Sequence, residues 1–248
     1  MRKFGLVGKK LNHSFSKLYF EKKFKAENIF DAEYSLYEID YPEDIKTLLL
    51  KDRNIVGLNV TNPFKKAVIP FLDELSEAAA DIGAVNTIAI KNDSKSRHLI
   101  GYNTDYVGFY ETIKDKILKK ALVLGTGGSA AAISYALKLK NCEVIFVSRE
   151  CTRGFSYNSL DKSIIESVDI IVNCTPLGIF PDNHTYPPIP YKYINDKHFL
   201  YDLVYNPEET FFLHNGVKRG AKVKNGLEML YIQAEESWKI WQNSSSQI

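Results

Sequence analysis

Short apolar runs rich in β-branched and aromatic residues alternate with longer amphipathic stretches over the first hundred residues. This alternation is typical of βαβ units, in which amphipathic helices cover a mainly parallel sheet. Short apolar runs predict strands, whereas apolar positions three and four residues apart predict helices. The pattern predicts strands at 4–7, 33–39, 55–60, 85–90 and 97–100, and helices at 16–26, 42–50, 63–72 and 74–81.

A second series of the same kind begins near residue 121. Between the two series, the segment 104–118 places apolar residues at helical spacing with polar residues opposite, which predicts a bridging helix. We therefore expect an α/β protein of two domains, with a cleft that opens beside this helix. The second series predicts strands at 121–124, 144–147, 169–173 and 199–204, and helices at 129–139 and 227–241.

Charge and cysteine content argue against several classes of partner. Among 248 residues, 32 lysines and arginines nearly balance 30 aspartates and glutamates, so we expect no nucleic-acid or membrane partner. Cys142, Cys151 and Cys174 form no CxxC or Cys/His cluster, and predict neither a disulfide framework nor a metal site. The N-terminal apolar stretch ends at Gly8, too early for a secretion signal. We expect a cytoplasmic monomer or homodimer that acts on a small molecule.

Six residues at the junction of a predicted strand and a predicted helix form a glycine-rich turn. Backbone N–H groups of such a turn, together with the positive end of the following helix, bind a pyrophosphate. A purely structural tight turn is the alternative. Dinucleotide binding implies a Rossmann-type domain at 104–225, which leaves 1–103 as a separate domain. The residues of the turn are Gly125, Thr126, Gly127, Gly128, Ser129 and Ala130.

The residues that follow the second strand of this domain bear on the choice of cofactor. An acidic residue usually binds the ribose 2'-hydroxyl of NAD at this place. Here the chain reads Ser148, Arg149 and Glu150, with Arg153 soon after. Arginine pairs with a 2'-phosphate, so NADP is favoured over NAD. The alternative is that both arginines are solvated loop residues, because Glu150 would repel a phosphate if it faced inward.

Lys65 and Asp105 are the candidate catalytic residues. Lys65 follows Pro63 in the expected first turn of a helix, where the helix dipole disfavours a cation, and such conflicts are typical of functional sites. An ordinary solvated lysine is the alternative. Asp105 begins the bridging helix, where an acidic residue also serves as a cap. If the cleft brings the two together, the carboxylate orients the ammonium beside a reacting carbonyl.

Two hydroxyls, of Ser14 and Ser16, stand at the expected entrance to the first helix. One interpretation is a helix N-cap with a second hydroxyl in the loop before it. The other is a clamp for the carboxylate of a ligand.

Several short segments occur in a fixed order along the chain. Besides the glycine turn, they are Asn12-His13-Ser14-Phe15-Ser16, Gly57-Leu58-Asn59-Val60-Thr61-Asn62-Pro63-Phe64-Lys65, Gly83-Ala84-Val85-Asn86-Thr87, Gly101-Tyr102-Asn103-Thr104-Asp105, Asn173-Cys174-Thr175-Pro176-Leu177-Gly178, Asp202-Leu203-Val204-Tyr205 and Asn225-Gly226-Leu227-Glu228-Met229-Leu230, which continues to Gln233. Each segment says little alone, but the ordered set is highly specific. In this set the chain resembles the shikimate dehydrogenase family over nearly its whole length.

The resemblance implies an enzyme that reduces 3-dehydroshikimate to shikimate with NADPH, in the pathway to aromatic amino acids. It implies Lys65 and Asp105 as the catalytic pair. It further implies that 1–103 is the substrate-binding domain, completed by the C-terminal helix 226–248, which returns to it. It also adds Thr175 and Gly226 to the cofactor-binding residues. By position, the substrate carboxylate binds Ser14 and Ser16 with Tyr205 nearby, and the ring hydroxyls bind Thr61, Lys65, Asn86, Asp105 and Gln233.

Two departures from the family pattern keep alternatives open. Lys17 stands where the family usually has proline, and Ser148-Arg149-Glu150 replaces an Asn-Arg-Thr signature. The acidic residue leaves open a quinate/shikimate dehydrogenase that uses NAD. A non-catalytic, cofactor-binding regulatory homologue is the alternative from a different class.

Overall fold

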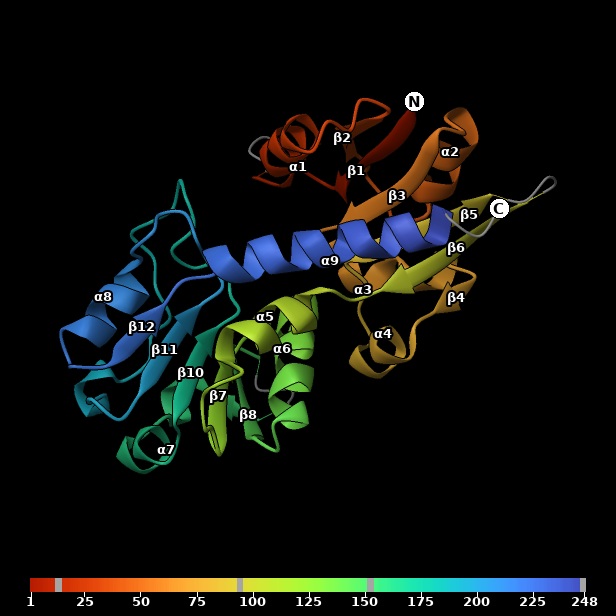
Figure 1. Ribbon diagram of the computed structural model, residues 1–248. Helices are drawn as coiled ribbons and strands as arrows, with labels where there is room; N and C mark the ends of the chain where they lie inside the picture. The colour runs from red at the N-terminus through yellow and green to blue at the C-terminus, as the bar shows by residue number, and fades with distance from the viewer. Residues whose placement is uncertain (12–14, 93–95, 151–153, 246–248) are drawn as a thin grey trace. The chain divides into compact units, whose positions relative to one another are not determined.

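The computed structural model describes residues 1–11, 15–92, 96–150 and 154–245. The chain divides into two compact units, of which the first comprises Met1–Thr104 with Gln233–Ile248 and the second comprises Asp105–Ile232. Helix α9 (Leu227–Ser245) therefore begins in the second unit and ends in the first (Figure 1). Both units are α/β, so the expected fold class is confirmed.

The sheet of the first unit has the strands β1 (Arg2–Gly8), β2 (Ala32–Glu38), β3 (Ile55–Val60), β4 (Glu74–Leu75), β5 (Thr87–Asn92) and β6 (Arg97–Tyr102). Their order is β2-β1-β3-β5-β6-β4. β1 pairs in parallel with β2 and β3, and β4 pairs in parallel with β6. β5 is antiparallel to both β3 and β6. The sheet is therefore mixed, with its parallel part on the N-terminal strands.

Helices cover both faces of this sheet. They are α1 (Phe15–Ala26), α2 (Asp44–Lys51), α3 (Phe64–Ala67), α4 (Glu77–Ile82), a 3-10 turn η1 (Ile69–Phe71) and the second half of α9. On one face, Phe20 of α1 and Trp238 of α9 pack with Phe4 of β1. On the other face, Ile45 of α2 packs with Leu58 of β3.

Trp241 is the largest fully buried side chain among the described residues, and it anchors α9 to the sheet. Its indole Nε1 donates to the backbone O of Ile88 at 3.0 Å. A Cβ built on Gly57 would lie 2.6 Å from the indole ring, so this strand position has no room for a side chain. Glycine at this position of β3 allows the indole ring to pack directly on the strand backbone.

Two helices of the first unit differ from the sequence prediction. In place of one helix over 63–72, the chain forms the short α3 and the turn η1, because Pro70 supplies no backbone N–H for a continuous α-helix. Pro63 caps α3 instead of occupying its first turn. In place of a helix from 74, the chain pairs as β4, and α4 begins only after Ser76, whose hydroxyl accepts from the N–H of Ala79.

The sheet of the second unit has the strands β7 (Lys120–Leu124), β8 (Glu143–Ser148), β9 (Phe155–Ser156), β10 (Ile170–Asn173), β11 (Phe199–Asp202) and β12 (Lys222–Lys224). All pair in parallel, in the order β12-β11-β10-β7-β8-β9. The chain moves outward from β7 in one direction and then from β10 in the other. Nucleotides bind at the carboxyl ends of strands beside such a switch point.

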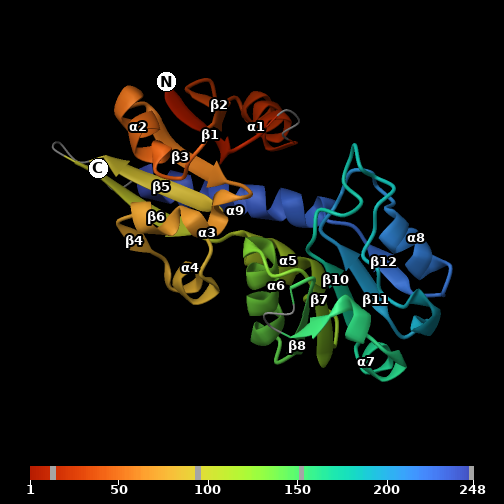
Figure 2. The ribbon, with the colours of Figure 1, turned by 180° about the vertical axis from the view of Figure 1, so that it is seen from behind.

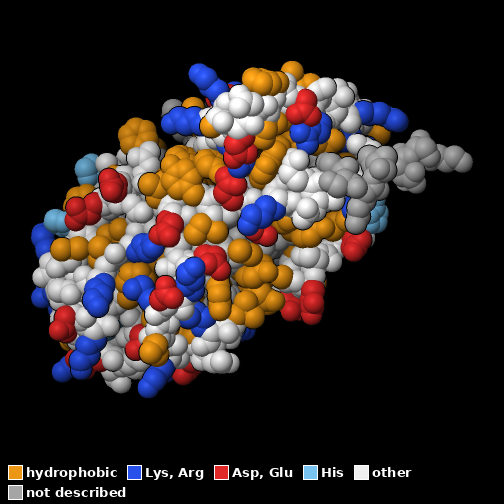
Figure 3. All heavy atoms as spheres, in the orientation of Figure 1, with side chains coloured by type: hydrophobic (Ala, Val, Ile, Leu, Met, Phe, Trp, Pro, Cys, Tyr) orange, Lys and Arg blue, Asp and Glu red, His pale blue; other side chains and the backbone are white. Residues whose placement is uncertain are grey.

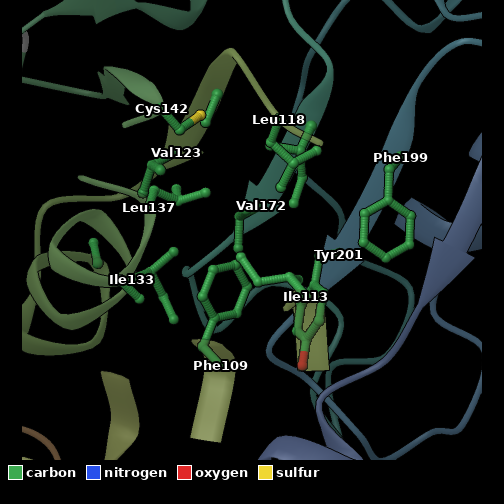
Figure 4. Close-up of a cluster of buried hydrophobic side chains, with 14 of the residues drawn as sticks. Phe109, Ile113, Leu118, Val123, Ile133, Leu137, Cys142, Val172, Phe199 and Tyr201 are labelled. Atoms are coloured by element: carbon green, nitrogen blue, oxygen red, sulfur yellow. The ribbon is translucent and has the colours of Figure 1, made fainter. Parts of the chain in front are cut away.

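The helices of the second unit are α5 (Asp105–Ile113), α6 (Gly128–Leu139), α7 (Lys162–Glu166), α8 (Phe211–Val217), the first part of α9 and the 3-10 turns η2 (Tyr157–Ser159) and η3 (Tyr191–Tyr193). α5 and α6 cover one face of the sheet, where the ring of Phe109 meets Tyr201 edge-on at 4.9 Å (Figure 4). α7 and α8 cover the other face (Figure 2).

The bridging helix is shorter than the sequence predicts. α5 ends at Ile113, and Ile117, expected on its apolar face, is 91% exposed. The pattern also missed the short elements α7, α8, β4, β9 and β12. On the face drawn in Figure 3, acidic and basic side chains are interspersed. Within the described ranges, no helix has the length and apolar composition that a membrane crossing requires.

Candidate active site

Asn86, Thr104 and Gln233 form a buried hydrogen-bonded cluster in the first unit. Asn86 Nδ2 donates to Thr104 Oγ1 at 2.9 Å and to Gln233 Oε1 at 3.3 Å. The backbone N–H of Thr104 donates to Asn86 Oδ1 at 2.6 Å. α9 thus brings Gln233 to a residue 147 positions earlier in the chain. Two of the predicted substrate-binding residues lie side by side.

Thr61 and Lys65 follow β3 in the same unit. The backbone N–H of Thr61 donates to the O of Val7 at 3.0 Å, which holds the end of β3 against β1. Lys65 lies in α3, and its backbone O accepts from the N–H of Val85 at 2.7 Å. Because Val85 directly precedes Asn86, the backbone of Lys65 lies close to the buried cluster.

Of the two predicted carboxylate-binding serines, the structure places one. Ser14 lies outside the described residues. α1 begins at Phe15, so Ser16 lies inside the helix and the N-cap interpretation is wrong for it. Its side chain hydrogen-bonds the hydroxyl of Tyr34.

Asp105 and Tyr205 belong to the second unit. Asp105 is the first residue of α5, is 6% exposed, and directly follows Thr104 in the chain. Its charge complements the positive end of the helix dipole. Tyr205 is half-buried, and burial raises the pKa of its hydroxyl, which therefore stays protonated and can donate a hydrogen bond.

The glycine-rich turn joins β7 to α6 at the switch point of the second sheet. Gly125 has a φ of 106°, a conformation that side chains disfavour, and α6 begins directly after Gly127. A Cβ on Gly127 would meet no atom within 4 Å, so the space before the helix is open. Ala130 is buried against the sheet, while Thr126 is exposed and Ser129 half-buried. Open space at a helix N-terminus suits a pyrophosphate.

A buried hydroxyl at the end of β8 fits the same ligand. Ser148 is 8% exposed, and its Oγ has no hydrogen-bond partner among the described residues. Burial of an unsatisfied polar atom is costly, so such an atom is normally satisfied by a ligand or water. Arg149 and Glu150 follow it and are both exposed, whereas Arg153 lies outside the described residues. The placement of Ser148 and Arg149 fits the adenosine ribose of a dinucleotide.

Asn173 and Asp202 organise the loops that follow β10 and β11. Asn173 Oδ1 accepts from the N–H and the hydroxyl of Thr175 at 3.0 and 2.6 Å. Its Nδ2 donates to Asp202 Oδ1 at 2.9 Å. Gly226, before α9, donates its N–H to the O of Val204 at 3.4 Å. Sequence reasoning gave Asn173 and Asp202 no role; the available signal was a polar residue at the end of a buried strand.

Asp202 makes the stability of the protein depend on pH. Burial raises the pKa of its carboxyl group to about 6. Hydrogen bonds donated by Thr210, Val204 and Asn173 act in the opposite direction and lower the pKa, but burial has the larger effect. The folded protein therefore binds more protons than the unfolded chain between about pH 4 and pH 6, and its free energy of unfolding falls as the pH rises through that range.

We expect Asp202→Asn to remove this titration. The free energy of unfolding of the wild type minus that of the variant should fall by about 1–3 kcal/mol between pH 4 and pH 7. Urea unfolding at each pH measures the difference. A difference independent of pH would contradict a carboxyl that titrates near pH 6 in the folded state.

Comparison with known proteins adds family information to this geometry. Residues 6–88 match the family model of the shikimate dehydrogenase substrate binding domain. The shikimate dehydrogenase (NADP(+)) of Caldicellulosiruptor bescii is 36% identical, over 97% of this chain and 89% of that protein.

Two solved structures have the same fold over nearly the whole chain. Shikimate 5-dehydrogenase from Thermus thermophilus, in complex with NADP(H) and shikimate, is 28% identical with a TM-score of 0.83, over 98% of this chain and 94% of that one. Quinate dehydrogenase from Corynebacterium glutamicum, in complex with NAD, is 26% identical with a TM-score of 0.84, over the same shares of 98% and 94%.

Proposed function

The chain belongs to the shikimate dehydrogenase family, and we propose that it reduces 3-dehydroshikimate to shikimate with NADPH, reversibly, in the biosynthesis of aromatic amino acids. The observation that carries this proposal is the buried pair of Asn86 and Gln233. The pair lies in the unit whose residues 6–88 match the substrate-binding model. Amide groups held beside the backbone of Lys65 suit a small acid that carries several hydroxyls.

Substrate binding is proposed for eight residues. Ser14 and Ser16 bind the carboxylate through charge-assisted hydrogen bonds, with Tyr205 as a further donor. The ring hydroxyls bind Thr61, Asn86 and Gln233, together with the catalytic residues Lys65 and Asp105.

Proton transfer is proposed for Lys65. When bound, NADPH supplies the hydride that reduces the carbonyl carbon. The carbonyl oxygen gains negative charge and takes a proton, which Lys65 donates from Nζ. The proposed role of Asp105 is to orient the ammonium group through its carboxylate.

Cofactor binding is proposed for the second unit. The turn at the start of α6 holds the pyrophosphate, and Ser148 and Arg149 bind the adenosine ribose and its 2'-phosphate. The proposed cofactor-binding residues are Gly125, Thr126, Gly127, Gly128, Ser129, Ala130, Ser148, Arg149, Arg153, Thr175 and Gly226.

One assay tests the function directly. Absorbance at the nicotinamide band should show oxidation of shikimate with NADP by the purified protein. Quinate with NAD is the second candidate, which the exposed Glu150 and the similarity to quinate dehydrogenase favour. No turnover with either acid and either cofactor would favour a regulatory homologue. A cytoplasmic monomer or homodimer remains a prediction from the sequence.

Arg149→Ala should weaken NADP binding and spare NAD. A hydrogen bond to a charged group contributes about 1.5–3 kcal/mol, which corresponds to a rise of about 10- to 150-fold in the dissociation constant for NADP. Fluorescence titration with both dinucleotides measures the change. Arg219→Ala, at another exposed arginine of the same unit, is the matched control and should leave both constants unchanged.

Glu150→Thr tests the neighbouring side chain. If Arg149 faces the ribose, Glu150 points to solvent and the preference for NADP over NAD stays as in the wild type. A large gain in NADP affinity would instead show that Glu150 faces the ribose and repels the 2'-phosphate.

A further inference from the structure

Asn59 is a buried polar residue of the first unit to which the proposed function gives no role. It lies in β3 and is 6% exposed. A buried amide destabilises the fold unless both its donor and its acceptor are satisfied. The partners of Asn59 therefore show what this side chain connects.

The carbonyl end of the Asn59 amide faces Tyr34. The Tyr34 hydroxyl donates its proton to Asn59 Oδ1 at 2.9 Å, so Ser16 is the donor in its hydrogen bond to the Tyr34 oxygen. Burial raises the pKa of Tyr34, so the phenol stays protonated and remains a donor. Its ring stacks on Phe20 with centroids 4.5 Å apart, which fixes the position of the hydroxyl.

The amino end of the Asn59 amide leads to Asn86 and Gln233. Asn59 Nδ2 donates to the backbone O of Asn86 at 3.2 Å, to Thr87 Oγ1 at 3.2 Å and to Ser237 Oγ at 3.0 Å. Ser237 is fully buried on α9, and its hydroxyl donates to the backbone O of Gln233 at 2.9 Å. One side chain therefore joins β2, β5 and α9.

Backbone groups fix the orientation of the amides in this network. The backbone O of Asn86 only accepts, so the amino group of Asn59 faces it and the Asn59 carbonyl faces Tyr34. The backbone N–H of Thr104 only donates, so it faces the Asn86 carbonyl. The Asn86 amino group consequently faces Gln233 Oε1. These contacts turn the carbonyl of the Gln233 amide toward Asn86.

We propose that Asn59 is a positioning residue for substrate binding: its amide holds Asn86 and Gln233 in one hydrogen-bond arrangement. The inference rests on the proposed function, because it takes those two residues as substrate contacts. Groups that are already ordered bind a ligand without the entropic cost of ordering them. Loss of the Asn59 amide should therefore weaken the binding of shikimate and leave the binding of NADP unchanged.

A double-mutant cycle tests the connection. Asn59→Ala should raise the dissociation constant for shikimate about 3- to 10-fold, as for one net hydrogen bond, with NADP binding unchanged. Gln233→Ala should raise it as well. If Asn59 acts through Gln233, the double variant should bind shikimate within about twofold of the weaker single variant, whereas independent effects would multiply. Calorimetric titration measures all four proteins.

Two buried tyrosines supply a matched pair of variants. Tyr34→Phe removes the donor to Asn59 Oδ1, and Tyr201→Phe removes a buried hydroxyl 3.0 Å from Thr112 in the second unit. Both should lower the thermal midpoint. Only Tyr34→Phe should raise the dissociation constant for shikimate, by about 2- to 10-fold. If Asn59→Ala fails to fold, this pair of variants still tests the positioning role of Asn59.

The outcomes separate the two proposals. A wild-type protein that neither binds shikimate nor oxidises it contradicts the proposed function. A wild-type protein active on shikimate, with multiplicative effects of Asn59→Ala and Gln233→Ala, contradicts the positioning role alone. Equal effects of Tyr34→Phe and Tyr201→Phe on shikimate binding contradict it as well.

Discussion

Lys65→Ala is expected to lower kcat for shikimate oxidation by about 100- to 10,000-fold, the range for loss of a general acid or base. In this direction Lys65 accepts the hydroxyl proton that it donates during reduction. KM should change less, because Asn86 and Gln233, which are joined by a hydrogen bond, remain as substrate contacts. Alanine keeps the backbone hydrogen bond from Val85, so the fold should be maintained.

Two further variants show whether the loss of kcat in Lys65→Ala results from the loss of proton transfer by Lys65. Lys65→Arg keeps the positive charge but holds its proton too tightly to transfer it, so kcat should remain low. Lys66→Ala, at the exposed lysine next in α3, should leave kcat within about twofold of the wild type, as for a surface substitution. Steady-state absorbance at the nicotinamide band measures all three. Near-normal turnover of a folded Lys65→Ala protein would rule out proton transfer by this residue.

Sequence periodicity located the long elements because their burial is regular. β3 has the bounds that the apolar run at 55–60 predicts. In β7, Val123 packs on one face of the sheet and Leu122 on the other, which explains a continuous apolar run in place of alternation. Elements such as α7 and β9 are too short to show a period. Ile117 followed the helical spacing but lies beyond the end of α5, where no neighbour buries it.

The glycine turn could be recognised from the sequence because its residues are contiguous and each has a local physical reason. The contact between Asn86 and Gln233 could not, because spacing says nothing about residues 147 positions apart; it was expected only from the family resemblance. Asn59 and Ser148 illustrate a second limit. A sequence shows the type of a polar residue, but burial and the partners of its polar atoms decide its role.

Trp241→Ala is expected to lower the free energy of unfolding by about 3–5 kcal/mol, as for a large aromatic residue removed from a core. The indole is fully buried, its ring lies 4.9 Å from that of Phe4, and its N–H donates to the O of Ile88. Urea unfolding followed by circular dichroism measures the loss. Tyr231→Ala, on the same helix at a residue 41% exposed, is the control and should change the free energy by less than about 0.5 kcal/mol.

Gly57 shows whether the loss reflects this particular packing contact. Gly57→Ala alone should destabilise the protein by about 1–3 kcal/mol, because its Cβ would lie 2.6 Å from the indole of Trp241. Trp241→Ala leaves a cavity where the indole was, and the methyl group of Gly57→Ala can enter it. In that background Gly57→Ala should therefore no longer lower the free energy of unfolding. Additive effects of the two substitutions would show that Trp241 is not what excludes a side chain at position 57. Gln233 lies about two helical turns before Trp241 on α9. Shikimate binding should therefore weaken in Trp241→Ala. It should recover in part when Gly57→Ala places a methyl group in the cavity.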